Sequence, residues 1–272
     1  MKIGLTGSSG VLASSLLKIL NKNNLKYFKG RIENTKDVHN WINANSFEYI
    51  IHLAALVPTN LVNKDRNKAL HVNFKGTKNI VDAINKNSKK KIWFFYSSTS
   101  HVYEFNSKII KETNHTKPIS YYGKTKLLGE RYLLENTKKI TPCIGRIFSY
   151  TSKKQKNSFI IPSIFKKLKH KNKKLYINNM NHERDFLPIE DICKAIKILL
   201  KKKSNGIFNI CSGKRLNLQD IFLKLNDKRY QKEVIINQNK NKTILYGSNK
   251  KLLKLGWKQK NINYVNYLLN NY

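Results

Sequence analysis

The sequence contains little cysteine. Its 272 residues include three, Cys143, Cys193 and Cys211, which lie far apart and form no Cys-x-x-Cys pair. Disulfide frameworks and structural zinc sites need cysteines at close, regular spacings. The sequence therefore predicts no disulfide and no metal site, and we expect three buried or half-buried thiols.

Long apolar runs are also missing. No segment approaches the ~20 consecutive apolar residues that span a membrane. The chain opens directly into MKIGLTG, without the charged-then-apolar pattern of a signal peptide. We therefore expect a cytoplasmic protein with no membrane partner. The hydrophobic fraction of 40% is enough for one large α/β domain, or for a dinucleotide-binding domain with a smaller lobe.

Acidic residues and arginine are scarce, so the charge balance is one-sided. The chain has 53 Lys and Arg against 16 Asp and Glu, a net charge of +37, and only 7 of the 53 are Arg. Arginine is the side chain that binds phosphates and guanines through paired hydrogen bonds, and the lysines are spread along the whole chain. These observations favour a solvated basic surface over a specific nucleic-acid partner. Such a surface still attracts an anionic substrate.

Strands and helices alternate along the first part of the chain. The apolar pattern predicts strands over residues 2–6, 25–28, 49–53, 92–97 and 144–148. It predicts helices over residues 11–21, 36–45, 64–87 and 121–136. This alternation is typical of a doubly wound parallel sheet of the Rossmann type.

Beyond residue 150 the alternation loosens. The pattern there predicts helices over residues 157–170, 188–201 and 217–226, separated by short strand-like pieces. We therefore predict an α/β fold with a dinucleotide-binding domain over residues 1–150. A smaller C-terminal α/β substrate lobe over residues 151–272 is expected to be interleaved with the first domain.

A glycine turn follows the first predicted strand. Gly7, Ser9, Gly10 and Val11 fall in the segment TGSSGVLA, with the spacing Gly-x-x-Gly-x-x-Ala. Glycines allow a sharp turn and a close approach of the backbone to a pyrophosphate, and the following helix offers free N–H groups to phosphates. The strand before and the helix after the turn support this interpretation. The sequence thus predicts that these residues bind a dinucleotide.

The end of the second strand bears on which dinucleotide is bound. The segment LKYFKGR contains no acidic residue that would bind a ribose hydroxyl. Lys29 or Arg31 could contact a 2′-phosphate, which favours NADP. The alternative is that both are ordinary surface cations of a lysine-rich chain, so NAD stays open.

Tyr122 and Lys126 lie four residues apart in a predicted helix, and hence on one face. A neighbouring ammonium favours the phenolate and lowers the tyrosine pKa from its usual ~10. Tyr122 could then exchange a proton with a sugar hydroxyl or carbonyl while hydride moves to or from a nicotinamide. Upstream, SSTSHVY follows an apolar strand at the sheet edge where ligands bind. A hydroxyl there can orient the reacting oxygen.

These segments, taken in order, resemble motifs of the NAD-dependent epimerase/dehydratase family, the extended short-chain dehydrogenase/reductases. TGSSGVLA resembles the cofactor turn of that family, and HLAA (52–55) resembles a strand-end motif along the cofactor. VNFKGT (72–77) resembles the long-helix motif, while SSTSHVYE and YYGKTKLLGE resemble the two catalytic motifs. Three later segments also resemble motifs of the family, namely RDFLPIEDI (184–192), FNICSG (208–213) and LGW (255–257).

The resemblance implies an NAD(P)-dependent enzyme that acts on a nucleotide-activated sugar. It implies catalytic roles for Thr99, Tyr122 and Lys126. Contacts with NADP or NAD are implied for the glycine turn and for Leu53, Ala54, Ala55 and Lys126. A homodimer formed through the helices near 64–87 and 121–136 would fit the family.

Two further residues are candidates for the substrate. Arg184 is expected to bind the diphosphate of a sugar nucleotide, because a guanidinium pairs with two phosphate oxygens. The alternative for Arg184 is a salt bridge to Asp185 or Asp191. His101, two residues after Thr99, stands where some family members carry an extra acid–base group, and imidazole titrates near neutrality. The alternative is a loop histidine with no role.

Four positions depart from the family pattern. Ser100 and His101 stand where the dehydratases carry an Asp-Glu pair, which disfavours a 4,6-dehydratase. Ser149 stands where many relatives have an Asn that contacts the nucleotide phosphate, and Ala13 replaces a glycine. We therefore expect a 4-keto-sugar reductase, with a nucleotide-sugar 4-epimerase as the alternative. A non-catalytic dinucleotide-binding regulatory protein is the further alternative, which the Thr-Tyr-Lys set opposes.

Overall fold

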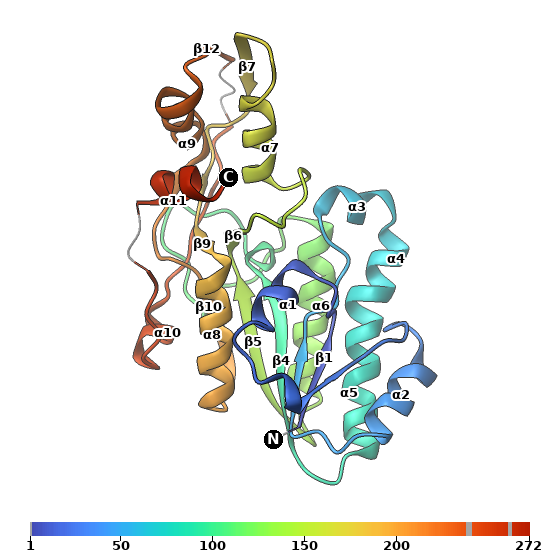
Figure 1. Ribbon diagram of the computed structural model, residues 1–272. Helices are drawn as coiled ribbons and strands as arrows, with labels where there is room; N and C mark the ends of the chain where they lie inside the picture. Colours follow the sequence, from blue (N-terminus) through green and yellow to red (C-terminus); the bar gives the residue numbers. More distant parts are fainter. Residues whose placement is uncertain (1, 238–240, 261–262) are drawn as a thin grey trace.

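A six-stranded parallel sheet forms the centre of the computed structural model, which describes residues 2–237, 241–260 and 263–272 (Figure 1). The strand order is β10-β5-β4-β3-β1-β2. The strands are β1 (Ile3–Thr6), β2 (Leu25–Tyr27), β3 (Tyr49–His52), β4 (Ile92–Thr99), β5 (Ile140–Ile147) and β10 (Gly206–Ile210). All neighbouring strands run parallel.

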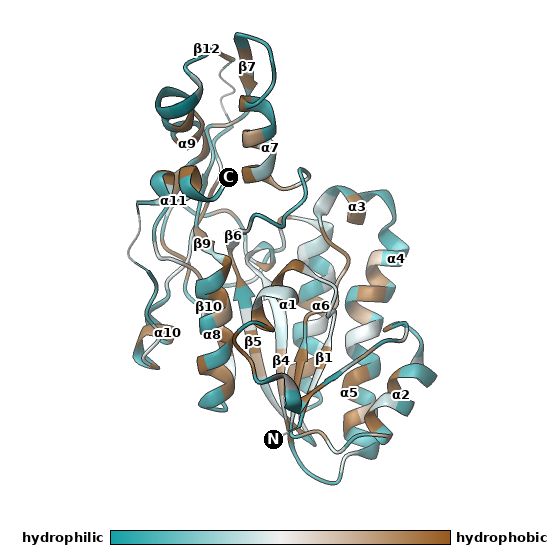
Figure 2. Ribbon diagram, in the orientation of Figure 1, coloured by the Kyte–Doolittle hydropathy of each residue, from teal (hydrophilic) through white to brown (hydrophobic). Residues whose placement is uncertain are grey.

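Helices cover both faces of this sheet. One face packs against α1 (Val11–Leu16) and α8 (Ile189–Lys201), and the other packs against α2 (Thr35–Asn43), α5 (Gly76–Asn87) and α6 (Tyr121–Glu135). Successive strand residues point to opposite faces, so Phe94 lies in one core and Phe95 in the other. Brown and teal alternate along α5 and α8, as expected for helices with one buried face (Figure 2). The predicted doubly wound α/β fold is confirmed.

The strand order places a topological switch between β1 and β3. The chain passes from β1 to β2 on one side and then returns to β3 on the other side of β1. In open parallel sheets, ligands bind beyond the carboxyl ends of the strands at this point. The glycine turn follows β1 and the HLAA segment follows β3, so both lie at the switch.

The C-terminal part contributes both to the sheet and to a smaller lobe, which lies above the sheet in Figure 1. Its residues 206–210 form β10, which pairs with β5, and α8 packs on the sheet. The lobe contains the strands β6 (Ser149–Thr151), β7 (Lys174–Asn178), β8 (Glu183–Arg184), β9 (Phe186–Pro188), β11 (Leu216–Asn217), β12 (Glu233–Asn237) and β13 (Ile244–Leu245). Its helices are α7 (Ile160–Leu168), α9 (Leu218–Leu225) and α11 (Tyr264–Asn271), whereas α10 (Lys250–Lys254) lies beside β10 and packs Leu252 into the core of the main sheet. A separate apolar core joins α7, α9 and α11.

The first predicted helix, 11–21, is too long, because α1 ends at Leu16. Beyond that residue the backbone tightens, with the Lys18 and Ile19 N–H groups bonding to carbonyls three residues back. Leu16 and Leu20 both remain buried, so the apolar spacing continues past the end of the helix.

The predicted helix over 64–87 is interrupted near its start. A short helix, α3 (Thr59–Lys64), ends at Asp65, whose backbone leaves the helical region at φ −140° and ψ 85°. The Asp65 carboxylate then accepts a hydrogen bond from the Lys68 N–H at 2.8 Å and caps α4 (Arg66–Leu70). A π-helical turn over His71–Lys75 joins α4 to α5.

The three cysteines, Cys143, Cys193 and Cys211, are buried and free, as predicted. In the part of the chain that the structure describes, none of the helices is both long enough and apolar enough to span a bilayer.

Candidate active site

A cavity of about 750 Å³ lies between the carboxyl ends of the strands and the small lobe. Apart from Lys126 and the two candidates for a 2′-phosphate, Lys29 and Arg31, its lining includes the predicted site residues, namely Gly7, Ser9, Gly10, Val11, Leu53, Ala54, Ala55, Thr99, His101, Tyr122 and Arg184. Segments far apart in the sequence therefore share one cavity, which runs from the glycine turn to the substrate lobe.

The glycine turn forms one wall of the cavity. Gly7 has φ +72°, a conformation that side chains rarely adopt. A Cβ at Gly7 would also lie 2.6 Å from the Ala54 nitrogen, so the turn after β1 packs directly on the backbone that follows β3. No side chain caps the first turn of α1 at Gly10, which leaves backbone N–H groups there available to a ligand.

Buried hydrogen bonds hold the segment after β3 in place. The His52 ring lies 2.6 Å from the Thr6 hydroxyl and 3.0 Å from the Thr77 hydroxyl. Burial lowers the pKa of His52 well below its usual value, so the ring is a neutral bridge between β1, β3 and α5. Asn73 accepts a hydrogen bond from the Leu56 N–H at 2.7 Å and donates one to Thr125 at 3.1 Å.

The catalytic-motif residues Thr99 and Tyr122 come from different elements. Thr99 ends β4, and its Oγ1 accepts a hydrogen bond from the His101 N–H at 3.3 Å. Tyr122 lies in the first turn of α6, which Ser120 caps by accepting from the Gly123 N–H at 3.0 Å. A Cβ at Gly123 would lie 2.1 Å from the His101 carbonyl oxygen. Glycine therefore allows α6 to approach the segment after β4 closely.

The electrostatics of Tyr122 differ from the expectation. The sequence predicts that Lys126 lowers the pKa of Tyr122. Instead, burial raises the pKa of Tyr122 above its usual value, and the nearby Tyr150 phenol raises it further. Desolvation of the phenolate is thus the main cause of this shift, and Lys126 is not among its causes.

Lys126 lies beneath the cavity rather than in its wall. Its side chain is 1% exposed, and Nζ lies 4.1 Å from the centre of the Tyr96 ring. Burial lowers the pKa of Lys126 to about 7, although the Glu130 carboxylate acts in the opposite direction. Among the described residues no carboxylate forms an ion pair with this ammonium.

His101 lies beside Tyr122, with the ring centroids 6.0 Å apart. Its Nδ1 lies 3.0 Å from the Ser120 hydroxyl. Burial, and secondarily the positive charge of Arg184, lower the pKa of His101 to about 4. The ring is therefore neutral near neutrality.

Arg184 has no acidic partner among the described residues, so the alternative of a salt bridge to Asp185 or Asp191 is wrong. Asp185 accepts hydrogen bonds from Ser212, Gly213 and Gly247, and Asp191 pairs with Lys194. The Arg184 guanidinium instead donates to the Thr243 carbonyl at 2.9 Å and the Thr243 hydroxyl at 2.8 Å. Burial lowers the pKa of Arg184 to about 10, which leaves it charged at neutral pH.

A buried ion pair behind the cavity was missed by the sequence reasoning. Arg146 Nη2 lies 2.6 Å from Glu130 Oε2, and the two side chains are 4% and 1% exposed. Ser98 donates to Glu130, and Arg146 donates to the Tyr103 hydroxyl at 2.8 Å. This network ties α6 to β4 and β5. The signal in the sequence was an arginine inside the apolar strand predicted over 144–148 and a glutamate inside the helix predicted over 121–136.

Comparisons with known proteins show what the chain is similar to. The family model described as GDP-mannose 4,6 dehydratase matches residues 12–262. A GDP-6-deoxy-D-talose 4-dehydrogenase from Aggregatibacter actinomycetemcomitans is 28% identical over 231 residues, covering 82% of this chain and 78% of that protein. A putative UDP-glucose 4-epimerase from Methanocaldococcus jannaschii is 30% identical over 252 residues, covering 88% and 81%.

The fold also matches solved structures. The structure of RMD from Pseudomonas aeruginosa complexed with NADPH superposes with a TM-score of 0.87 at 21% identity, covering 100% of this chain and 98% of that one. Other structures of similar fold were solved with NAD or with a nucleotide sugar. At this identity the likeness shows the fold.

Proposed function

The chain belongs to the NAD-dependent epimerase/dehydratase family, and from this premise we propose that it is an NADPH-dependent reductase of a nucleotide-activated 4-keto sugar. The observation that carries the proposal is the shared cavity. The glycine turn, the Thr99 and Tyr122 hydroxyls and the unpaired Arg184 guanidinium all line it. A guanosine diphosphate sugar is the substrate we favour, because the matching family model and the talose dehydrogenase relative are both described with GDP sugars.

The residues present fit a dinucleotide. Gly7 lies so close to the Ala54 backbone that a Cβ would fill the space between them. Because no side chain stands there, the backbone of the turn stays accessible to a bound dinucleotide. The turn from Gly7 to Val11 would hold the pyrophosphate through N–H groups. Leu53 to Ala55 would lie along the dinucleotide. When bound, the reduced nicotinamide supplies a hydride to the sugar carbonyl carbon.

Arg184 would hold the substrate. Its guanidinium is largely buried and remains charged at neutral pH. It pairs with no carboxylate of the described residues, so none competes with a phosphate for it. Thr243 fixes the orientation of the guanidinium through two hydrogen bonds. Arg184 is thereby prepared to bind the diphosphate with little loss of side-chain entropy.

Tyr122 would supply the proton. As the sugar carbonyl carbon gains a hydride, its oxygen gains negative charge, and the Tyr122 hydroxyl donates the proton that makes it a hydroxyl. Because burial raises the pKa of Tyr122, the phenol holds its proton until the reaction begins. Thr99 would donate a hydrogen bond to the same oxygen. Lys126 lies on the same helix face and would stabilise the phenolate, which water then reprotonates.

Arg31 supports NADPH over NADH. It lies four residues after the last residue of β2 and its side chain is 79% exposed. Within the described part of the chain its ion pair is with Glu33, at 2.9 Å. Exposed ion pairs contribute about 0–1 kcal/mol, so a 2′-phosphate can displace Glu33 at small cost. We expect Arg31→Gln to weaken NADPH binding while NADH binding stays the same. Fluorescence titration with both coenzymes measures the two affinities, and an equal change in both would contradict this assignment.

The direct test of the reaction uses Tyr122→Phe. This variant keeps the ring but removes the acidic hydroxyl, so we expect kcat to fall by about 10²–10⁴ while NADPH affinity is unchanged. Unchanged turnover would overturn the role of Tyr122. If the wild type binds NADPH but turns over no nucleotide sugar, the regulatory alternative gains support instead.

A 4-epimerase is the second candidate, because the Methanocaldococcus relative is described as a putative UDP-glucose 4-epimerase. The two activities use the coenzyme differently. An epimerase regenerates its coenzyme within each turnover and is expected to retain NAD through purification. A reductase exchanges its coenzyme. Mass spectrometry of nucleotide released on denaturation separates them.

A further inference from the structure

A single threonine, Thr243, contacts two side chains that line the 750 Å³ cavity, His182 and Arg184. His182 directly precedes β8, and Arg184 is the second residue of that strand. In an extended chain, residues two positions apart point to the same side. The Thr243 hydroxyl lies 3.0 Å from His182 Nδ1 and 2.8 Å from Arg184 Nη2. His182 and Arg184 are therefore neighbours in the cavity wall, held by one residue.

The contacts with Thr243 fix the proton of His182 on Nε2. The Thr243 N–H donates to His182 Nδ1 at 3.2 Å, so Nδ1 carries no hydrogen. The Thr243 hydroxyl accepts from Arg184 and donates its own hydrogen to Nδ1. Burial, and secondarily the positive charge of Arg184, lower the pKa of His182, which keeps the ring neutral. A neutral imidazole has a single N–H, which here is on Nε2.

This Nε2–H is available to a ligand. Within the part of the chain that the structure describes, the His182 ring forms hydrogen bonds with Thr243 alone, and both involve Nδ1. The residue is half-buried and lines the cavity. A donor that is partly removed from water gains most from an acceptor that carries charge.

Arg184 also keeps donors for a ligand. Its Nη1 donates to the carbonyls of Glu183 and Thr243, and its Nη2 donates to the Thr243 hydroxyl. The Nε–H and the second hydrogen of Nη2 have no acceptor among the described residues. These N–H groups lie along one edge of the guanidinium, where their spacing matches two oxygens of a phosphate.

We propose that His182 is a second donor to the diphosphate of the sugar nucleotide. The Nε–Nη2 edge of Arg184 would bind one phosphate group, and His182 Nε2–H would bind the other. A neutral donor suits this position, because a second positive charge beside Arg184 would be repelled. The inference rests on the proposed function, since it requires a nucleotide-sugar substrate, and it assigns a further binding residue to the same site.

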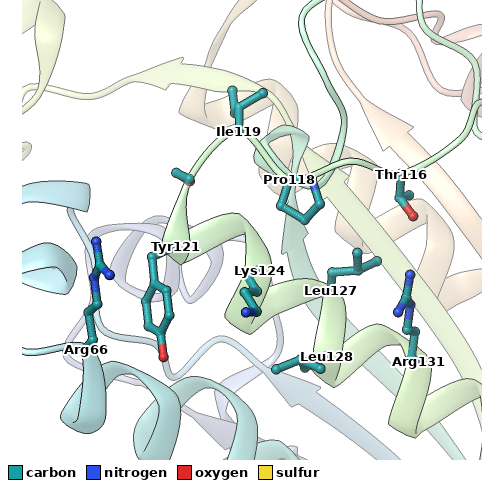
Figure 3. Close-up of a pocket in the computed structure, with 10 residues that line it drawn as sticks. Arg66, Thr116, Pro118, Ile119, Tyr121, Lys124, Leu127, Leu128 and Arg131 are labelled. Carbon is teal, nitrogen blue, oxygen red and sulfur yellow. The ribbon is translucent and has the colours of Figure 1, made fainter.

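A second cavity also offers cations that could attract a diphosphate. It measures about 490 Å³, and Figure 3 shows Arg66, Lys124 and Arg131 around it. None of these residues lines the 750 Å³ cavity. Lys124→Gln therefore serves as the control, because it removes a cation from the second cavity and leaves His182 and Arg184 in place.

The test titrates the full chain with GDP in a calorimeter, at saturating NADPH. His182→Asn keeps an oxygen near the position of Nδ1, which can accept from the Thr243 N–H, but it has no donor near Nε2. We expect GDP affinity to fall about tenfold or more, since a hydrogen bond to a charged group is lost. The longer His182→Gln places an amide N–H near Nε2 and should bind within about threefold of the wild type.

The outcomes separate this inference from the function on which it rests. A wild type that binds neither GDP nor UDP would overturn both. Unchanged affinity in His182→Asn, or an equal loss in His182→Gln or Lys124→Gln, would overturn the role of His182 and leave the proposed function standing. The loss should be equal for GDP and UDP, which share the diphosphate, and a loss confined to GDP would place the contact on the base instead. Equal urea midpoints check that all variants fold.

Discussion

The buried ammonium of Lys126 should make the stability of the protein depend on pH in a specific window. Replacing Lys126 with Met keeps the length of the side chain and removes the titrating group. In the folded protein burial lowers the pKa of Lys126 to about 7, whereas an unfolded lysine titrates near ~10.4. Between these values the unfolded chain binds the proton and the folded chain releases it.

The sign and the size follow from proton linkage. Because the unfolded state binds more protons in this window, stability rises as the pH is raised from about 7 toward ~10.4. The gain is lost again as the pH falls to about 7, below which both states hold the proton. The slope approaches about 1.4 kcal/mol per pH unit for one proton. Integrated from about pH 7 to about pH 9, this slope raises the unfolding free energy of the wild type by about 2 kcal/mol more than that of Lys126→Met.

Urea denaturation at several pH values tests this, followed by circular dichroism and tryptophan fluorescence together so that two-state behaviour is checked. Lys124→Met, an exposed position on the same helix, is the control, and its difference from the wild type should not vary with pH. Other titrating groups are common to all three proteins and cancel in the differences. A difference between wild type and Lys126→Met that stays constant over the window would refute the reasoning.

The remaining predictions concern the substrate contact and the ion pair. Arg184→Lys keeps the charge but loses the paired donors held by Thr243. We expect a higher KM for the nucleotide sugar, by about tenfold or more, with unchanged NADPH affinity, and an unchanged KM in steady-state assays would argue against diphosphate binding there. Glu130→Gln leaves Arg146 buried without a counter-charge, so unfolding free energy should fall by about 3–5 kcal/mol. Exposed Glu135→Gln should change it by less than about 0.5 kcal/mol, and denaturant titration that finds equal effects would show that the pair matters little.

The layout of the sheet was predictable because its central strands are apolar runs buried on both faces. Ile92–Thr99 and Ile140–Ile147 pair in the centre, and parallel strands in that position need little polar patterning. The glycine turn was also predictable. Gly7 occupies a conformation that few residues other than glycine adopt, so the turn leaves a glycine in the sequence as its signal. Periodicity could not reveal the break at Asp65, which depends on a cap formed by its own side chain.

The site was predictable as a set of residues but not as an electrostatic environment. Motifs identified Tyr122 and Lys126, yet their spacing could not show that both would be desolvated and that burial would dominate their pKa values. The orientation of Arg184 depends on Thr243, 59 residues away. Such contacts follow from the folding of the small lobe and have no local signal in the sequence.

Under the proposed function, this chain reduces a nucleotide-activated 4-keto sugar with NADPH. The most direct measurement mixes the purified protein with NADPH and a GDP-linked 4-keto-6-deoxyhexose, and follows both coenzyme absorbance and the mass of the sugar nucleotide. We expect NADPH to be consumed in an amount equal to that of a product that has gained two hydrogen atoms. A protein that binds neither NADPH nor NAD, with the sugar nucleotide unchanged, would contradict it.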